Sequence, residues 1–303
     1  MRTSKVATVN ARYPRLVVAA LAALAVAATT AGCSSSLPSS VAAAPVESVV
    51  TGLWPLAVAA QAIGGDKVAV DDVVPAGDNP FTYPLDPARQ RTVEAAGLAV
   101  EIGRGFQPAF EEAARHAPRT LALEQVLRPA SPYVWLSPTM MERAVSAIAD
   151  AMTSADPPAG PLFERNAAGF RAEIESLRID YSSTLSVCPG TAVVAPDRAL
   201  ADLAGDLGLT ETVVAASASA ASVSGAARVL ESANATALIR QPWVDDSGVE
   251  RVGAAAGIRP TEFDTLAGVP AGPVTGSGDP YTQLMENDLN VLSRALGCNN
   301  NEQ

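Results

Sequence analysis

The spacing of apolar residues over positions 46–156 alternates between short β-branched runs and longer stretches with an apolar residue every three or four positions. The short runs predict strands and the longer stretches predict helices. The predicted strands are 46–54, 67–74, 98–102 and 120–124, and the predicted helices are 55–64, 86–96, 108–116 and 137–152. Asp86-Pro87 and Ser137-Pro138 each pair a capping side chain with a proline at the first helical position, which favours a helix start at both places.

A single apolar stripe follows the break at residues 156–160. Its members keep a spacing of three or four and predict one long amphipathic helix: Phe163, Ala167, Phe170, Ile174, Leu177, Tyr181 and Leu185. A second alternating series comes after it, with strands at 192–195, 212–216, 237–239 and 259–264. The helices of this series begin at Asp197, cover 222–232 and 247–256, and close the chain after the cap at Asp279-Pro280.

This alternation predicts an α/β fold with two lobes, each a mostly parallel sheet flanked by helices, joined by the long helix. The predicted boundaries are 46–158 for the N-terminal lobe, 159–187 for the linking helix and 188–303 for the C-terminal lobe. Length alone allows one large domain or two smaller lobes, so the pattern decides between them. Open α/β sheets bind ligands beyond the carboxyl ends of their strands, which places the expected site in the cleft between the lobes.

The first 32 residues have the composition of an export signal. Four basic residues precede an uninterrupted apolar run over positions 16–28, and no acidic residue occurs before Cys33. The run is too short for a membrane-spanning helix, which needs about 20 residues. A signal peptide is therefore the better interpretation.

The signal ends in Thr30-Ala31-Gly32-Cys33, which resembles the bacterial lipobox. That resemblance implies cleavage before Cys33 and acylation of its thiol; the alternative is a free or disulfide-bonded cysteine after an ordinary cleavage site. Residues 33–45 are small, polar and interrupted by proline, so they are expected to form a flexible tether. We therefore expect a lipid-anchored protein on the extracytoplasmic face of the cell membrane.

Charge excludes some classes of partner. Residues 1–32 hold four of the 21 basic residues and none of the 32 acidic ones, so 17 basic residues remain and the formal charge becomes -15. Nucleic acid and anionic lipid surfaces are poor partners for such a chain.

Two further cysteines, Cys188 and Cys298, lie near the two ends of the predicted C-terminal lobe. Exported proteins reach oxidising compartments in which disulfides persist, so we expect these two cysteines to form a disulfide. Two buried free thiols are the alternative.

Five segments, in order, resemble the zinc/manganese (cluster A-I, TroA-like) family of ABC-transporter substrate-binding lipoproteins over about Val49 to Leu296. They are residues 63–68 (IGGDKV), 74–83 (VPAGDNPFTY), 131–138 (SPYVWLSP), 263–268 (FDTLAG) and 281–287 (YTQLMEN). The resemblance implies two rigid lobes joined by a long helix, with a transition metal held between them by histidines and carboxylates. Imidazole suits zinc, and carboxylate favours manganese.

At three of the four positions where the resemblance implies metal ligands, this chain has other residues. Phe81 and Tyr133 stand where the first two histidines belong, and Pro196 stands at or beside the third. The aspartate is kept as Asp264. The one histidine of the chain, His116, lies in a predicted helix remote from these loops and is expected to be a surface or helix-end residue.

Three roles are open for Asp264: a lone, weak metal ligand, a loop or capping carboxylate, or a charge partner for Arg240, whose guanidinium favours bidentate contact with carboxylates. Phe81 and Tyr133 can either pack and close the cleft or form an aromatic ligand box.

Enzyme chemistry has little support in the sequence. Gly103-Arg104-Gly105 lacks the third glycine of a dinucleotide-binding loop, and no phosphate-binding Gly-Lys-Ser/Thr loop occurs. A serine hydrolase triad would require His116. We therefore expect a binding protein with no catalytic residues.

The resemblance implies a monomeric solute-binding lipoprotein that delivers its solute, zinc or manganese, to a membrane ABC permease. The missing ligands leave the solute open. The alternative is a non-transport lipoprotein that uses the same scaffold for protein–protein interaction.

The lipobox gives a first prediction. Wild-type protein should partition into detergent and carry acyl chains on Cys33, because cysteine is the acceptor of the lipid. Cys33→Ser should release or mislocalise the protein, as followed by detergent phase separation and mass spectrometry. Fully soluble, unacylated wild-type protein would remove this interpretation.

Overall fold

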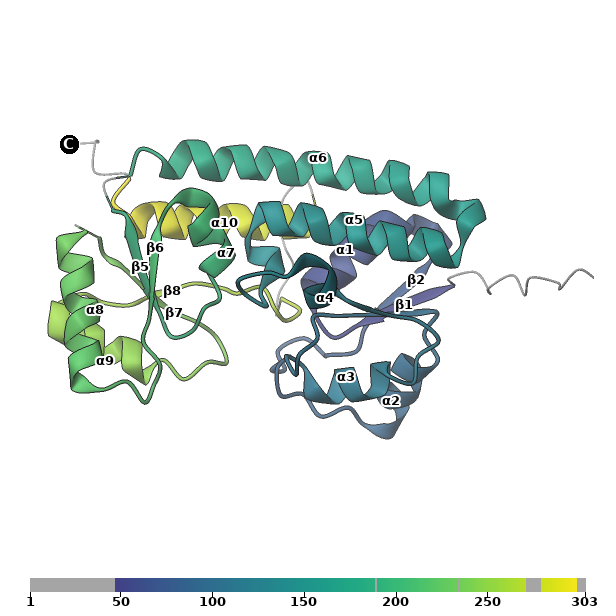
Figure 1. Ribbon diagram of the computed structural model, residues 1–303, viewed down its shortest axis with the longest axis horizontal. Coiled ribbons are helices and arrows are strands. Elements are labelled where there is room, and N and C mark those ends of the chain that lie inside the picture. The colour runs from purple at the N-terminus through teal and green to yellow at the C-terminus, as the bar shows by residue number, and fades with distance from the viewer. Residues whose placement is uncertain (1–46, 189, 234, 271–278, 299–303) are drawn as a thin grey trace, which may run out of the picture. The chain divides into compact units, whose positions relative to one another are not determined.

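Two parallel sheets organise the part of the chain that the structure, a computed structural model, describes: residues 47–188, 190–233, 235–270 and 279–298 (Figure 1). The N-terminal sheet has the order β2 (Ala69–Asp72), β1 (Ser48–Thr51), β3 (Leu98–Glu101), β4 (Thr120–Ala122). The C-terminal sheet has the order β6 (Thr210–Val213), β5 (Ala192–Ala195), β7 (Ala237–Arg240), β8 (Thr261–Glu262). All pairings are parallel, so the predicted two-lobed α/β fold is confirmed.

Both faces of each central strand are buried, and successive residues of a strand pack into different hydrophobic cores. Val49 of β1 joins the main core, whereas Val50 joins a smaller core with helices α2 (Pro87–Glu94) and α3 (Pro108–Ala114). In the same way Val193 of β5 faces the main core. The other face of the C-terminal sheet packs on α8 (Ala220–Ser232) and α9 (Ser247–Ala256). Because both faces are covered, the central strands are continuous apolar runs.

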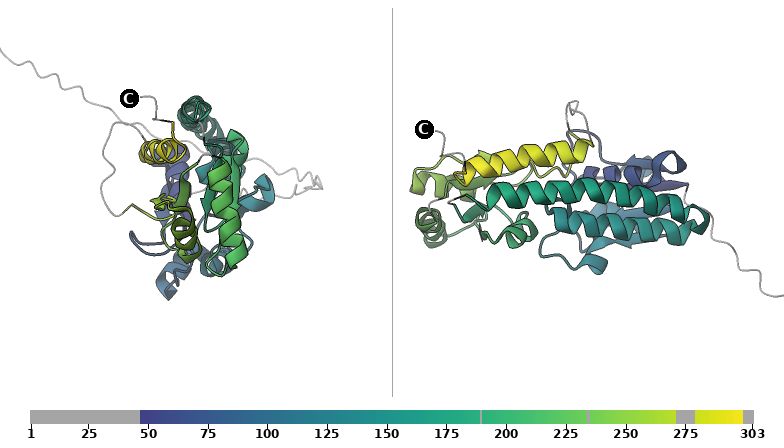
Figure 2. Two further views of the ribbon diagram at one scale, coloured as in Figure 1. Left: turned by 90° about the vertical axis from the view of Figure 1, so that its left-hand side faces the viewer. Right: turned by 90° about the horizontal axis from the view of Figure 1, so that it is seen from above.

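One long helix, α6 (Gly160–Leu185), runs along both lobes (Figure 1). All seven members of the predicted apolar stripe are buried, as expected. At about 1.5 Å per residue its 26 residues span about 39 Å. It packs against α1 (Trp54–Gly64), α5 (Pro138–Ala155) and α10 (Pro280–Ala295), and Figure 2 shows α5, α6 and α10 side by side.

These helices give the two lobes a shared core that runs from β1 to the end of α10. Tyr181 of α6 is fully buried and donates its hydroxyl to the Met285 carbonyl of α10 at 2.7 Å. The remaining helical segments are α4 (Leu123–Leu127), α7 (Ala201–Leu207), and the 3-10 turns η1 (Gly65–Lys67), η2 (Val134–Leu136) and η3 (Pro157–Ala159).

The predicted capping residues act as expected. The Asp86 carboxylate accepts hydrogen bonds from the backbone N–H groups of Ala88 and Arg89 at the start of α2. Ser137 caps α5, and Asp279 caps α10 by accepting from the Tyr281 N–H at 2.8 Å. Each bond satisfies a backbone donor that has no partner within its helix.

Several predicted boundaries were wrong. Strand β1 ends at Thr51, and Trp54 already belongs to α1, because Pro55 occupies the first turn of that helix. Helix α4 was not predicted. Leu123 and Leu127, four residues apart, are both buried in the core, so the chain forms a helical turn where the sequence pattern predicts the end of a strand.

The edge strands of the C-terminal sheet also differ from the prediction. Gly208 ends α7 in a left-handed conformation, so the chain turns early and β6 begins at Thr210 rather than at 212. Strand β8 is only two residues long, because pairing with β7 is limited to Thr261 and Glu262.

The predicted signal peptide, Cys33 and the tether fall within residues 1–46, outside the described residues. Among the residues that are described, the helices are too short or too polar for any to cross a membrane.

A disulfide joins Cys188 and Cys298 in the structure, with their Cα atoms 4.2 Å apart. It connects the chain just after α6 to the chain just after α10. Beside it, the Gly190 N–H donates to the Leu296 carbonyl at 3.0 Å. The bridge therefore ties the end of the C-terminal lobe to its beginning.

Removing this bridge should destabilise the protein. It encloses 110 residues, so the double variant Cys188→Ala/Cys298→Ala should lose up to about 4–5 kcal/mol of unfolding free energy, since the open chain gains entropy when unfolded. Urea unfolding followed by circular dichroism measures this loss. Two freely alkylatable thiols in folded, exported wild-type protein would contradict the pairing.

Candidate functional site

The four positions at which metal ligands were expected follow strands or precede a turn in both lobes. Phe81 lies in the loop after β2, Tyr133 directly before η2, Pro196 directly after β5, and Asp264 after β8. Tyr133 and Pro196 are buried, Phe81 is half-buried and Asp264 is exposed. The loops that carry three of these positions therefore leave the carboxyl ends of strands, where open α/β sheets place their ligand sites.

An aromatic cluster, defined as Phe81, Phe106, Tyr133, Trp135 and Trp243, occupies this region. The ring of Phe81 meets Phe106, Tyr133 and Trp243 edge-on, with centroids 5.2, 5.7 and 6.3 Å apart. Phe106 and Tyr133 are 5.3 Å apart, and Tyr133 lies 5.5 Å from Trp135. Such pairs contribute about 0.5–1.5 kcal/mol each beyond burial, so the cluster is a stable packing unit.

Trp243 contributes the C-terminal lobe's ring to this cluster. Its backbone is left-handed, with a φ of 63°, which is costly for a bulky residue by about 1–2 kcal/mol. The indole lies against Gly268, where an added Cβ would come within 2.7 Å of the ring. Gly268 thus leaves room for an indole that reaches across to Phe81.

Tyr133 also makes a polar link between the lobes. Its hydroxyl donates to the Asp197 Oδ2 atom at 2.9 Å, while Asp197 Oδ1 accepts from the Ala199 N–H at 2.9 Å. Burial, and then the neighbouring Asp197 charge, raise the pKa of Tyr133 above its ordinary value. The phenol therefore stays protonated and serves as a donor to a carboxylate, one of the stronger classes of hydrogen bond.

Tyr133 belongs to a clasp segment, residues 130–137, that is hydrogen-bonded along its length to the C-terminal lobe. Its other bonds run from the Ala130 and Ser131 N–H groups to Asp202 (3.0 and 2.8 Å), from Ser131 Oγ to the Ala199 carbonyl (3.2 Å), from Trp135 Nε1 to the Thr265 carbonyl (2.7 Å) and from Ser137 Oγ to Asp206 (2.6 Å). Tyr281 of α10 completes the set by donating to the Trp135 carbonyl at 2.6 Å. The lobes are joined by the chain's own groups.

Asp264 has the geometry of a loop carboxylate. Its Oδ1 atom accepts from the Leu266 N–H at 2.9 Å, two residues along, and its side chain is exposed. Its own backbone N–H bonds to the buried carboxyl of Asp288. Burial, and then the Asp264 charge, raise the pKa of Asp288 well above its ordinary value, although this hydrogen bond opposes the shift.

One of the three roles left open for Asp264, pairing with Arg240, is not seen in the structure. Arg240 Nη2 instead lies 3.0 Å from Glu262 Oε2, and both side chains are largely exposed. The reason is register: Arg240 of β7 and Glu262 of β8 are paired directly across the two strands.

These residues do not fit a four-ligand zinc or manganese site. Phe81 and Pro196 offer no donor atom, and the Tyr133 hydroxyl is a protonated donor engaged with Asp197. No group of three or more His, Cys, Asp or Glu that could hold a metal ion occurs within the described parts of the chain. His116 is exposed just beyond α3, as predicted, on an element that contributes nothing to this region.

Comparison with known proteins identifies the scaffold. The family model described as "Zinc-uptake complex component A periplasmic" matches residues 49–295. The chain belongs to this zinc-uptake component A family. Its members are solute-binding proteins, not enzymes.

Solved structures share the same fold. A crystal structure titled ZnuA is 22% identical, with 84% of this chain and 100% of that chain covered and a TM-score of 0.68. The Zn(II)-bound ZnuA-like domain of Streptococcus pneumoniae AdcA is 21% identical, with 82% and 98% covered and a TM-score of 0.65. A Cd-bound periplasmic metal-binding protein of candidatus liberibacter asiaticus is 17% identical, with 82% and 99% covered and a TM-score of 0.71.

A protein of Thermotoga maritima, provisionally named as metal-binding, is 28% identical over 102 residues. That match spans 32% of this chain and 37% of the relative, so it covers well under half of either protein.

Sequence reasoning missed several residues that lie in the loops where the two lobes contact each other. Phe106 follows β3 and Trp243 follows β7, so the rule that sites gather beyond strand ends was the signal that could have found them. Gln241 and Thr265 follow strands of the C-terminal sheet and are buried, and their side-chain polar atoms have no hydrogen-bond partner among the described residues.

The bond between Tyr133 and Asp197 should be measurable by a double-mutant cycle. The variants Tyr133→Phe, Asp197→Asn and their combination should give a coupling of about 1.5–3 kcal/mol in unfolding free energy, because the bond joins a hydroxyl to a carboxylate. Urea unfolding at neutral pH provides the four values.

Tyr83→Phe is the matched control, since the Tyr83 hydroxyl bonds no described residue; it should change stability by less than about 0.5 kcal/mol. Additive effects of the two variants would mean that the lobes are not linked through this contact.

Proposed function

We propose that this chain is the extracytoplasmic solute-binding lipoprotein of a metal-uptake type of ABC importer, with lobes held together by its own side chains rather than by a metal. The observation that carries the proposal is the aromatic cluster with its Tyr133–Asp197 bond at the positions expected for metal ligands. Family membership over residues 49–295 supports the importer assignment.

In this proposal the protein binds zinc and manganese only weakly. Structural four-ligand zinc sites owe on the order of 10 kcal/mol or more to their ligands, and three of the expected four are absent here. Asp264 keeps a carboxylate, but the neighbouring Asp288 is buried, with a raised pKa that disfavours its charged form. The retained acidic groups therefore replace none of the missing imidazoles.

The proposed partner is a membrane ABC permease, with the monomeric binding protein anchored beside it through lipid on Cys33. Two features of the fold support this role. The lobes share one core, and the clasp segment bonds them without any ion, so the face offered to a permease is already formed before a solute binds.

Calorimetry with zinc and with manganese tests the metal proposal. Wild-type protein should bind both more weakly than about micromolar, because a single carboxylate cannot complete a tetrahedral shell. Asp264→Ala should leave this weak affinity nearly unchanged and cost only about 0.5–1.5 kcal/mol of stability, since the side chain is exposed and loses one hydrogen bond.

Two controls sharpen the comparison. Asp78→Ala removes an exposed carboxylate of the N-terminal lobe and reports non-specific metal binding. The ZnuA-like domain of Streptococcus pneumoniae AdcA, whose structure is titled as Zn(II)-bound, serves as the positive control. Submicromolar, stoichiometric metal binding that Asp264→Ala abolishes and Asp78→Ala leaves intact would overturn the proposal.

A further inference from the structure

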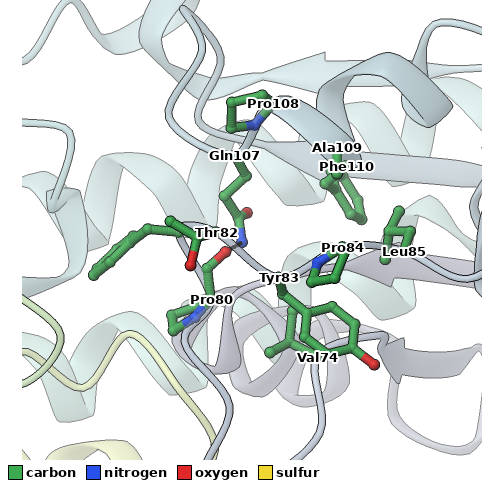
Figure 3. A pocket seen from close by; sticks show the side chains of 11 residues that line it. Val74, Pro80, Thr82, Tyr83, Pro84, Leu85, Gln107, Pro108, Ala109 and Phe110 are labelled. Carbon is green, nitrogen blue, oxygen red and sulfur yellow. Dashed lines mark hydrogen bonds between the residues drawn. The ribbon is translucent and has the colours of Figure 1, made fainter.

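Two of the cavities in the N-terminal lobe differ in the charge of their walls. One, of about 290 Å³, lies between the loop that follows β2 and the start of α3, and its wall is mostly apolar (Figure 3). The other, of about 340 Å³, lies between the loop that follows β3, the start of α4 and residues 129–132. Its wall includes the carboxylate of Glu124, so this second cavity, which we call the Glu124 cavity, has a group that can recognise a ligand by its charge.

Apart from this charge, the wall of the Glu124 cavity is mainly apolar. Its apolar side chains are those of Ile102, Phe106, Pro129, Ala130 and Pro132. The hydroxyl of Ser131 also lines it, but this group already donates to the Ala199 carbonyl at 3.2 Å. Among the described residues of the wall, the charged side chains are Arg104 and Glu124. Recognition of a polar group therefore falls to Glu124.

Glu124 is an acid that needs a positive partner. Its side chain is only 11% exposed, and a carboxylate removed from water without a cation beside it is costly. Arg104 supplies that cation, with its Nη2 atom 2.6 Å from Glu124 Oε1, yet the Arg104 side chain is itself 79% exposed. An ion pair whose arginine stays in water contributes little to stability, because water and salt compete for the guanidinium. The cation position beside Glu124 is therefore held weakly by the chain itself.

The backbone that carries Arg104 is unusual. Gly103, Arg104 and Gly105 all have positive φ values, of 96°, 58° and 79°, and such values are uncommon for a residue with a side chain. Directly after it the loop is anchored, because the Gly105 N–H donates to Glu111 Oε2 of α3 at 2.7 Å. The loop is thus fixed by its backbone, and the exposed Arg104 side chain can leave the carboxylate by rotating about its own bonds.

We propose that the Glu124 cavity binds a small organic cation with a flat apolar body, whose N–H-bearing positive group takes the place of Arg104 beside Glu124. The volume suits a single-ring molecule, and the Phe106 ring and the two prolines give its body an apolar wall. A planar amidinium or guanidinium matches the carboxylate best, because two parallel N–H groups can bond its two oxygens. Arg104 acts in this proposal as a displaceable stand-in for the ligand.

This site contains none of the four positions expected for metal ligands. It shares Phe106 with the aromatic cluster, and its wall includes Ala130 and Ser131 of the clasp segment. The inference rests on the cavity and on Glu124, and not on the proposed importer function. Its test uses no metal, so its failure and the failure of the metal proposal are separate results.

Benzamidine and benzamide test the charge requirement on the mature, disulfide-bonded protein. They have nearly the same shape, but benzamidine is positively charged at neutral pH and benzamide is neutral. The variant Arg104→Ala frees Glu124 of its competitor. Calorimetry on this variant, with saturation-transfer NMR as a second readout, should show benzamidine binding at least about tenfold more tightly than benzamide, the range expected for hydrogen bonds to a charged group.

Competition by Arg104 should be visible in the wild type. Benzamidine should bind wild-type protein roughly two- to fivefold more weakly than it binds Arg104→Ala, because it must first displace an exposed ion pair. The matched control is Arg115→Ala, which removes another exposed arginine that pairs with Glu112, outside the cavity. Since it changes the net charge equally, it should leave the wild-type affinity unchanged.

The near-isosteric change Glu124→Gln locates the binding. Added to Arg104→Ala, it should reduce benzamidine affinity at least about tenfold, to that of benzamide, because the carboxylate is the group that selects the cation. Circular dichroism and a thermal melt check that the double variant is folded. The comparison of the two probes on Arg104→Ala needs no change at Glu124, so it stands even if the double variant fails to fold.

The contrary results are distinct. Equal affinity of Arg104→Ala for benzamidine and benzamide would show that the cavity does not recognise charge. Tight benzamidine binding that survives Glu124→Gln would place the probe elsewhere. Benzamidine affinity that Arg104→Ala leaves unchanged or lowers would rule out Arg104 as a stand-in. Absence of saturable binding at millimolar benzamidine would leave the ion pair with a structural role alone.

Discussion

The clasp segment is the contact on which the relation between the two lobes depends. Residues 130–137 leave the N-terminal lobe and bond to carboxylates and carbonyls of the other lobe, including Asp202, Asp197 and the Thr265 carbonyl. Most of these groups are buried or half-buried, so their bonds form in an environment of low dielectric constant, where leaving any of them unpaired is expensive. The shared core beneath α6 brings the lobes together, and the clasp fixes how they meet.

A metal ion and an aromatic cluster join two lobes in physically different ways. A metal supplies a link that appears when the solute binds and disappears when it leaves. The cluster of Phe81, Tyr133 and Trp243 packs by dispersion and edge-to-face contacts that are present in the protein by itself. These contacts join the two lobes through the chain's own side chains.

Most of the fold could be predicted from the sequence because the main constraints are repetitive. The stripe from Phe163 to Leu185 keeps helical spacing over many turns, and each of its members is buried. Capping by Asp86 and Ser137 was predictable because it depends on neighbouring residues alone. Strand ends were less predictable, since β6 and β8 are delimited by a glycine turn and by pairing partners far away in the sequence.

The site was predictable only in part, because its chemistry depends on contacts between residues distant in the sequence. The absence of imidazole at Phe81, Tyr133 and Pro196 could be stated from the sequence, since residue type alone decides it. The partner of Arg240 could not, because the strand register that places Glu262 opposite it is set by pairing between strands that are distant in the sequence. The bond from Tyr133 to Asp197 could not be predicted either, because it depends on how the two lobes are placed relative to each other.

The scaffold and the site are under different physical constraints. Solved relatives at 16–22% identity keep the fold, because a core tolerates substitutions that conserve volume and pattern. A metal site depends on a few ligand atoms, whereas Phe81 and Tyr133 contribute ring packing and one hydrogen bond at positions where the resemblance implies ligands. Both residues are apolar or hydrogen-bonded, so they stabilise the contact between the lobes. Among the described residues, buried polar side-chain atoms of Gln241, Thr265 and Gln107 have no hydrogen-bond partner. Each unpaired atom costs folding free energy, so at these positions the sequence departs from what folding alone favours.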